Sequence, residues 1–222
     1  MLFYKKTIPD NYILVVDKTK VFIRPETMKL IMGSMISFKG RYALGSKQPF
    51  DVTFDYYYPN TSKNSLWKFL FNAFEPQLLN QAMVTKEEKE QFLIRHHIGM
   101  TNLIAEAYCE DGNSDDSKIS VTKLKEGIVE GLQKSKVEDI YFTSKNVKVL
   151  FEHYLSIKQF SQEWRETNLE DTFLLKIEQR EFRAHIMPSP TNRAFVKGQT
   201  VEWKKERYKE RFLNTKRIKI KV

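Results

Sequence analysis

The sequence predicts an α/β fold with three layers, in which helices cover both faces of a short, mostly parallel central sheet. Short apolar segments alternate with segments of helical periodicity along most of the 222 residues. Such alternation is typical of a parallel sheet covered by helices on both faces. With 41% hydrophobic and 13% aromatic residues, the chain can bury a substantial core. Ligands of these sheets bind at the carboxyl ends of the strands, so the connections after the strands are the candidate functional regions.

The first half of the chain contains three predicted strands and two predicted helices. Strands are expected at residues 12–16, 21–23 and 28–33, the last of them buried and ending at Gly33. A helix is expected from Ser65, because the apolar residues that follow it recur at helical spacing. A second helix is expected at residues 85–98, with Thr85 and Glu88 in the positions of a capping box.

The second half predicts further strand-to-helix units. Strands are expected at residues 100–109, 137–144 and in the segment 182–190 as far as Met187, and helices at residues 120–135, 145–155 and 199–213. The segment 156–171 is charged and aromatic without clear periodicity, and we interpret it as an insertion. We expect one domain over residues 1–222, with an N-terminal extension at 1–27 and a basic C-terminal helix and tail at 199–222.

The cysteine content and the lengths of the apolar runs indicate in which cellular compartment the protein is expected. A single cysteine, Cys109, excludes an internal disulfide, and the first ten residues lack the apolar run of a signal peptide. No apolar run is long enough to cross a bilayer. We expect a monomer that is not secreted and lies in the cytoplasm, associated with a bacterial nucleoid, or in a nucleus. The four histidines have no metal-ligand spacing, so neither a metal nor a cofactor is expected.

Positive charge is concentrated at the C-terminus. The net charge is +9. From Arg193 onward there are eleven basic and three acidic residues, a net +8, which leaves +1 for residues 1–192. Such a segment favours phosphate binding, and the alternative is a solvated helix face with a basic tail. In the last helix we expect Val201, Tyr208 and Phe212 to pack inward, and we expect three cations to point elsewhere: Lys204, Arg207 and Arg211.

Motifs along the chain resemble those of the uracil-DNA glycosylase superfamily, most closely its hypoxanthine-DNA glycosylase branch. In order they are IMGSMIS at 31–37 with YYYPNTSKNSLWKFL at 56–70, IGMTNLIAEAYCEDGNSDDSKI at 98–119, EDIYFTSKNVKVLFEHY at 138–154 and MPSPTNRAF at 187–195. The resemblance covers most of residues 29–213. It implies the fold of that superfamily, DNA containing a damaged base as the partner, and removal of a deaminated base such as uracil or hypoxanthine.

The resemblance implies that Asn64 is the catalytic residue, because the asparagine at this helix start helps to position the attacking water. A carboxamide cannot take up a proton near neutral pH. It can orient water and stabilise the charges that develop as the glycosidic bond breaks. The alternative is structural, since asparagine is also a favoured helix N-cap.

Substrate binding is expected from five residues: Gly33, Ser34, Tyr57, Tyr58 and Asn102. The first two form the glycine-serine strand end of the first motif. Either tyrosine could stack on a base flipped out of the helix, although tyrosine also favours ordinary strands. Asn102 could recognise the edge of the base, because a carboxamide offers both a donor and an acceptor.

DNA contacts are expected from the proline-braced loop: Pro188, Ser189, Pro190, Thr191, Asn192 and Arg193. Two prolines around a serine make a stiff turn that cannot join a sheet. In the resembling superfamily this loop presses on the DNA backbone, and its tip fills the gap left by the flipped nucleotide. The alternative is an ordinary strand-to-helix connection. His185, just before the loop, is expected in the core or in support of the site.

Departures from the family pattern support a second hypothesis. The first motif usually has a proline where this chain has Ile36, and the closest branch more often has an aspartate where this chain has Asn102. Pro190-Thr191-Asn192 replaces a more serine-rich run. The alternative is therefore a catalytically weak or inert nucleic-acid-binding protein on the same fold. A small-nucleotide enzyme is disfavoured, because the chain lacks a glycine-rich phosphate loop. The excised base and the strand preference stay open.

Overall fold

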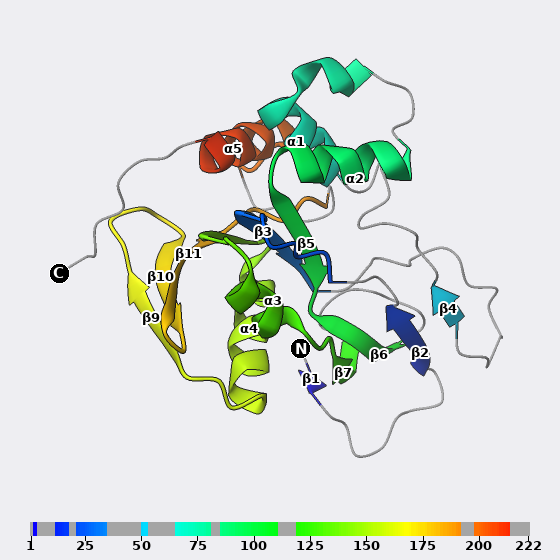
Figure 1. The fold of residues 1–222 in the computed structure, drawn as a ribbon. Coiled ribbons are helices and arrows are strands. Elements are labelled where there is room, and N and C mark those ends of the chain that lie inside the picture. The colour runs from blue at the N-terminus through cyan, green and yellow to red at the C-terminus, as the bar shows by residue number, and fades with distance from the viewer. Residues whose placement is uncertain are drawn as a thin grey trace.

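A six-stranded sheet with the strand order β5-β3-β8-β11-β10-β9 forms the centre of the computed structural model (Figure 1). Its first four strands are parallel to one another, and β10 runs antiparallel to both of its neighbours, β11 and β9. The strands are β3 (Lys29–Gly33), β5 (Ile98–Asn102), β8 (Asp139–Phe142), β9 (Gln162–Glu166), β10 (Thr172–Ile177) and β11 (Arg180–Ile186). The structure describes residues 2–3, 12–17, 21–34, 50–52, 65–80, 85–110, 119–191 and 198–213.

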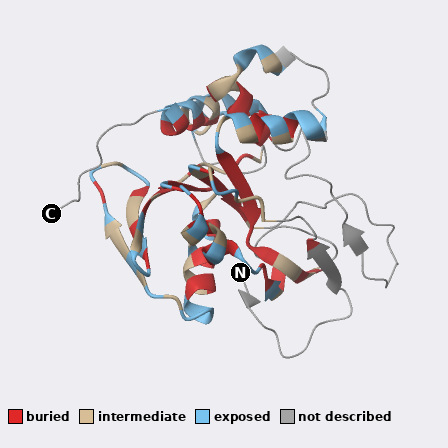
Figure 2. Ribbon diagram, viewed as in Figure 1, coloured by how far each residue is buried: buried red, intermediate tan, exposed pale blue. Residues whose placement is uncertain are grey.

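Helices cover both faces of this sheet (Figure 1). One face carries α1 (Leu66–Phe74), α2 (Lys86–Arg95) and α5 (Val201–Leu213), and the other carries α3 (Ile128–Lys134) and α4 (Lys145–Ile157). Every residue of β5 and β8 is buried between these layers (Figure 2), as expected for parallel strands covered on both sides. The prediction of an α/β fold with a mostly parallel central sheet is confirmed.

A second, five-stranded sheet with the order β1-β7-β6-β2-β4 lies beside the first. Its strands are β1 (Leu2–Phe3), β2 (Tyr12–Asp17), β4 (Phe50–Val52), β6 (Ile104–Glu110) and β7 (Ile119–Leu124). The strand predicted at residues 12–16 is therefore confirmed, as are the strand at 28–33, the helix after Ser65 and the elements at 137–144, 145–155 and 199–213. The capping box of α2 is present, because Thr85 and Glu88 exchange hydrogen bonds.

The prediction of one strand at residues 100–109 is wrong. The chain ends β5 at Asn102 and begins β6 at Ile104, in the other sheet. At the junction the Leu103 N–H donates to the carbonyls of Gly33 at 2.9 Å and Ser34 at 3.1 Å. Because Leu103 is as buried and apolar as its neighbours, no break in the hydrophobic pattern marks the change of sheet.

The prediction of one helix at residues 120–135 is also wrong. This segment begins with most of β7, and α3 starts only after Gly127, which adopts the left-handed conformation with φ +77°. Residues of β7 and α3 both contribute to the same buried cluster, so a strand followed by a short helix produced a spacing that resembles one amphipathic helix. The helix predicted at 85–98 ends earlier, at Arg95, and Ile98 already belongs to β5.

Two further segments differ from expectation. Residues 21–23 form no strand; Phe22 makes an isolated antiparallel bridge to Met100, with N–H···O distances of 2.9 and 3.0 Å. The segment 156–171 is no insertion, because it contains β9, the edge strand of the central sheet. No residue of β9 is fully buried. An edge strand of this kind tolerates charges on its solvent side, which explains its lack of apolar periodicity.

Gly99 on β5 permits the close approach of the chain around Phe22. A Cβ atom at this position would lie 2.7 Å from the Phe22 carbonyl oxygen and 2.9 Å from Thr27 Cγ2. We expect Gly99→Ala to lower the free energy of unfolding by about 1–3 kcal/mol, the usual effect of overpacking. Urea denaturation measures this change.

The control is Gly131→Ala in α3. There the three atoms nearest to the added carbon all belong to the Ile23 side chain, the closest at 3.1 Å, and alanine gains up to about 1 kcal/mol in helix propensity. Its net effect should stay within about 1 kcal/mol. A Gly99→Ala protein as stable as the wild type would contradict the packing of residues 22–27 on β5.

Candidate active site

The four parallel strands end at one edge of the central sheet. Gly33 of β3 pairs with Asn102 of β5, and Phe142 of β8 pairs with Met32 and with Ile186 of β11. Neighbouring strands are about 4.8 Å apart, so the ends of β3 and β11 flank β8 at a separation of about 10 Å. The first motif, the middle region and the end of β11 therefore meet at the edge where ligands of such sheets bind.

Gly33, Ser34 and Asn102 lie together at this edge. The Ser34 carbonyl accepts hydrogen bonds from Leu103 N at 3.1 Å and Ile104 N at 2.9 Å. Ser34 is half-buried, whereas Asn102 is completely buried. The crossing of the chain from β5 to β6 holds the glycine-serine strand end beside the asparagine.

The proline-serine loop, residues 187–191, is held by hydrogen bonds to three elements. The loop begins where Met187 N donates to the Phe142 carbonyl at 2.8 Å. Its own carbonyls accept from three partners: Tyr208 Oη to Pro188 O at 3.0 Å, Ser65 N to Pro190 O at 2.9 Å, and Lys204 Nζ to Thr191 O at 3.1 Å. Within the loop, the hydroxyl oxygens of Ser189 and Thr191 are 3.1 Å apart. The loop is thus fixed to β8, α1 and α5.

The hydrogen bond from Ser65 joins this loop to the start of α1. Ser65 occupies the N-cap position of α1 and its side chain makes no capping hydrogen bond, so the cap that the sequence suggested for Asn64 falls one residue later. The predicted catalytic residue and four other predicted site residues lie outside the described residues: Asn64, Tyr57, Tyr58, Asn192 and Arg193. Ser65 is the described residue that follows Asn64 directly.

The predicted orientation of α5 needs correction. Tyr208 and Phe212 are buried as expected, but Val201 is 46% exposed. Lys204 and Arg211, expected on the outside, are only 3% and 9% exposed. Lys204 lies four residues before Tyr208 and therefore on the same helix face, where its ammonium group reaches the Thr191 carbonyl. Burial lowers the pKa of both Lys204 and Arg211 below their ordinary values.

The solvent side of α5 is consequently nearly neutral. Of its five basic residues two are buried, and the charges of the other three are balanced by the three glutamates of the same helix. Lys205 pairs with Glu202, and Arg207 pairs with Glu210 at 3.2 Å. Of the net +8 from Arg193 onward, +6 belongs to residues 192–197 and 214–222, outside the described residues. Sequence counting alone assigned too much of the charge to the helix surface.

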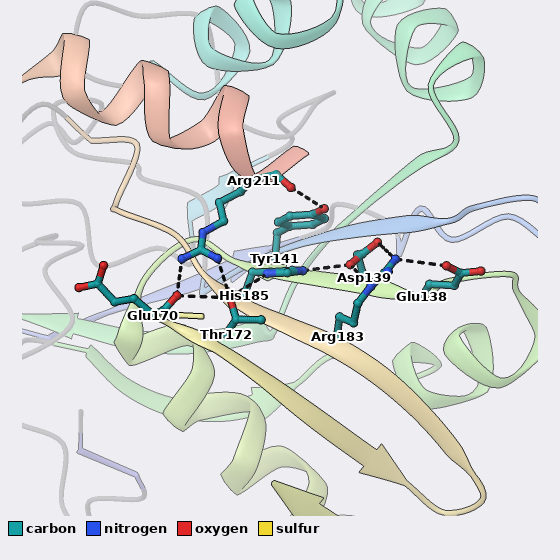
Figure 3. Close-up of polar contacts among 8 residues, drawn as sticks. All are labelled: Glu138, Asp139, Tyr141, Glu170, Thr172, Arg183, His185 and Arg211. Atoms are coloured by element: carbon teal, nitrogen blue, oxygen red, sulfur yellow. Dashed lines mark hydrogen bonds and ion pairs between the residues drawn. The ribbon is translucent and has the colours of Figure 1, made fainter. Parts of the chain in front are cut away.

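A chain of buried polar groups connects α5 to the sheet below the loop (Figure 3). Arg211 Nη1 donates to Thr172 Oγ1 at 2.7 Å, and Thr172 Oγ1 lies 3.3 Å from His185 Nδ1. His185 Nε2 lies 3.0 Å from Asp139 Oδ1, and Arg183 Nη2 donates to the other oxygen of Asp139 at 2.6 Å. His185 is therefore a buried residue that supports the loop beginning two residues later.

This chain favours the neutral imidazole. An ionised carboxylate only accepts, so His185 Nε2 carries a proton toward Asp139. Nδ1 of the neutral ring is then an acceptor that faces the Thr172 hydroxyl, which also lies 3.3 Å from the Glu170 carbonyl. Burial lowers the pKa of His185 below its ordinary 6.5, with the bond to Asp139 opposing part of the effect and the nearby Arg211 and Arg183 adding to it. Burial raises the pKa of Asp139, but hydrogen bonds from His185 and Arg183 outweigh this and hold it below its ordinary 3.8.

Asp17 and Lys125 are site neighbours that sequence reasoning missed. Asn102 Nδ2 donates to Asp17 Oδ2 at 2.9 Å, and Lys125 Nζ lies 3.2 Å from Asp17 Oδ1. All three side chains are buried. Burial lowers the pKa of Lys125, and the attraction of Asp17 opposes this change. The signal in the sequence was a lysine at the end of an apolar strand, which the assignment of residues 120–135 to a helix concealed.

Three other features were sought in the described part of the chain: a metal site, a membrane-spanning helix and a reactive thiol. No group of three or more His, Cys, Asp and Glu side chains among the described residues could hold a metal ion. Within the same residues, no helix has both the length and the apolar character needed to cross a membrane. Cys109 on β6 is buried, and burial raises the pKa of its thiol to about 12, which makes it a poor nucleophile.

Comparison with known proteins gives similarity to solved structures but no match at the level of sequence. No protein-family model and no curated protein matches the sequence. The chain is similar to the solution NMR structure of a "putative Uracil DNA glycosylase" from Methanosarcina acetivorans. The two chains are 18% identical, and the similarity covers 85% of this chain and 92% of that chain with a TM-score of 0.46.

The buried imidazole predicts a stability that depends on pH. The folded state binds the His185 proton less tightly than the unfolded state, so the stability is fully present above pH 6.5 and is lost as the pH falls from 6.5 through the folded-state pKa. We expect the free energy of unfolding to fall between about pH 7 and pH 5, with His185 contributing at most about 1.4 kcal/mol per pH unit. Urea denaturation at several pH values measures this slope.

The matched variant is His185→Gln, because glutamine can donate to Asp139 and accept from Thr172 but does not titrate. Its slope over the same range should be shallower than that of the wild type. The lowered pKa of Asp139 places its own contribution below pH 3.8, outside this window. Equal slopes for the two proteins would contradict the neutral buried imidazole.

Proposed function

We propose that the protein is a DNA glycosylase that removes a deaminated base, such as uracil or hypoxanthine, by hydrolysing the N-glycosidic bond after base flipping. The observation that carries this proposal is the hydrogen bond from Ser65 N to Pro190 O. It ties the helix-start motif, which contains Asn64, to the proline-serine loop. The chemistry requires a residue that directs water at the sugar beside an element that holds the DNA backbone.

In this proposal the proline-serine loop acts as the rigid DNA-binding element. Extrusion of a nucleotide from the DNA duplex costs a few kcal/mol. The protein element that contacts the distorted DNA strand must therefore be rigid. The loop carbonyls are bonded to α1 and α5, and Pro190 is buried. Asn192 or Arg193 at its tip fills the gap or contacts a phosphate, and Tyr57 or Tyr58 stacks on the flipped base.

The proposed chemical step uses one carboxamide. Asn64 orients a water molecule toward C1′ of the sugar while the bond between C1′ and the base nitrogen breaks. The oxygen of the water bonds to C1′, the base leaves with the electron pair, and the proton lost by the water neutralises the departing base. Asn64 lowers the barrier by its fixed dipole, since an amide takes up no proton. Gly33 and Ser34 line the strand end beside the base, and Asn102 recognises its edge.

Excision is tested directly with duplexes that carry uracil, hypoxanthine or xanthine at one position. The proposal expects an alkali-labile site at one or more of these bases and none in the unmodified duplex. Absence of excision on every deaminated base, together with retained DNA binding, would replace the proposal by the inert nucleic-acid-binding protein. The identity of the cleaved base tests the resemblance to the hypoxanthine-DNA glycosylase branch.

Asn64→Ala should lower excision about a hundredfold or more, the usual effect of losing one preorganised group, which corresponds to roughly 3 kcal/mol. Because Ser65 holds the N-cap position, stability should change by less than the roughly 1 kcal/mol of a lost cap. Single-turnover excision and urea denaturation separate the two effects. Asn64→Asp should also lose activity, because aspartate lacks the donor.

The matched control is Ser65→Ala, which keeps the backbone N–H that donates to Pro190. Its excision rate should stay within a few fold of the wild type. Wild-type excision by a folded Asn64→Ala protein would end the assignment of Asn64.

DNA affinity should fall steeply with salt, because each neutralised phosphate adds about 0.9 to the slope of log K against log salt. We expect Arg193→Ala to weaken binding and reduce this slope by about one. Lys209→Ala on α5 removes the same charge from a nearly neutral surface and should change the slope little. Binding titrations at several salt concentrations measure both, and equal effects of the two variants would contradict the proposed contact surface.

A further inference from the structure

Asp17, Asn102 and Lys125 form a buried cluster where the two sheets meet. Asp17 ends β2 and Lys125 follows β7, both in the five-stranded sheet, whereas Asn102 ends β5 of the central sheet. Their exposed fractions are 5%, 0% and 6%. Lys125 is anchored further, because its ammonium group donates to the Asp17 carbonyl at 3.1 Å and its backbone N–H donates to Leu103 O at 2.8 Å.

The Asp17 carboxylate decides which way the carboxamide of Asn102 is turned. An ionised carboxylate offers only acceptors, so it pairs with the NH₂ group and excludes the amide oxygen. The observed contact joins Asn102 Nδ2 to Asp17 Oδ2 at 2.9 Å. The flipped amide would place two acceptors against each other. Lys125 forms an ion pair with the other carboxylate oxygen at 3.2 Å, so both oxygens of Asp17 are held by a donor.

The opposite end of the carboxamide is left with an unused acceptor. Asn102 Oδ1 is buried and has no hydrogen-bond partner among the described residues. Most buried side-chain polar atoms are paired, so an unpaired buried oxygen on the residue that pairs with Gly33, at the carboxyl edge of the parallel strands, indicates a group that a ligand completes.

We propose that Asp17 and Lys125 are positioning residues that set the base specificity of this site, by holding Asn102 so that its Oδ1 and not its NH₂ group meets the flipped base. The proposal rests on the proposed function, because it takes a flipped base as the ligand. Neither Asp17 nor Lys125 touches the base; both act through the orientation of Asn102.

An acceptor at this position selects bases with a ring N–H. Uracil carries this hydrogen on N3 and hypoxanthine on N1, whereas cytosine and adenine have an unprotonated, accepting nitrogen at the equivalent place. Two facing acceptors repel, and a buried group left unpaired is strongly penalised. Sites built around such a hydrogen bond reject a ligand that lacks the matching group by about 10⁴-fold or more. Deamination converts the ring nitrogen from acceptor to donor, so the cluster distinguishes the damaged base from its parent.

The test measures equilibrium binding of duplexes with one deoxyinosine, N1-methyl-deoxyinosine or deoxyadenosine, in an Asn64→Ala background that prevents turnover. We expect the first duplex to bind about 100-fold or more tightly than the other two. Asp17→Asn frees the carboxamide to turn, because asparagine both donates and accepts. The preference should then fall to about tenfold or less, and Lys125→Gln should reduce it in the same direction.

Asp139→Asn is the matched control. It makes the same chemical change at another buried aspartate, 9% exposed, that also bonds to a cation, and it should keep the full preference. An undiminished preference in both Asp17→Asn and Lys125→Gln would overturn the inference, as would a wild-type site that binds the three duplexes equally or not at all. The comparison of the three duplexes on the unaltered cluster does not depend on whether the Asp17→Asn and Lys125→Gln proteins fold.

Excision, measured separately on the unsubstituted protein, distinguishes the two failures. A deoxyinosine preference that Asp17→Asn abolishes, in a protein that excises nothing, would refute the glycosylase proposal and keep the inference. Excision without the preference would do the reverse.

Discussion

The hydrogen bonds to the carbonyls of the proline-serine loop hold the candidate active site together. Two of the five loop residues are prolines and have no N–H to donate, and the loop carbonyls take donors from other elements. Tyr208 and Lys204 of α5 and the backbone of Ser65 supply them. These bonds place α5 across the end of β11 and bring the start of α1 to the same point. A buried lysine is costly unless its charge is well solvated by the protein, and here the Lys204 ammonium group donates to the Thr191 carbonyl.

Much of the fold was predictable because local patterns and tertiary structure agree. Leu66, Phe69 and Leu70 are spaced for a helix, and all three are buried in one cluster with Tyr208 and Phe212 of α5. The buried run 29–33 and the capping box at Thr85 were equally clear. The meeting of Gly33 with Asn102 and of the proline-serine loop with β8 follows from parallel order alone, since the carboxyl ends of parallel strands share one edge.

The remainder depended on contacts that no local pattern records. Leu103 is apolar like its neighbours, so the change of sheet after Asn102 is invisible in the hydrophobic pattern. Lys204 was placed outside because it is charged, although its spacing from Tyr208 puts it on the buried face of α5. Asp17 and Lys125 are 108 residues apart, and their pairing follows from the antiparallel contacts of β2 and β7 with β6. Lys204 was misplaced because its charge was given more weight than its position on the helix. The buried pair of Asp17 and Lys125 depends on long-range strand pairing, which the local sequence does not show.

The composition of the second sheet has a consequence for the order of assembly. Leu2 pairs with Ser120 and Tyr12 with Glu110, so β1 and the edge of β2 that faces β6 leave a ribosome before partners that are synthesised about one hundred residues later. Closing such long loops carries an entropic cost that local contacts do not repay, which delays non-local pairing. The nascent N-terminal strands therefore wait with open hydrogen-bonding edges, a state that invites aggregation. The Asp17 to Asn102 contact can form only after that wait, so the candidate site is completed late in folding.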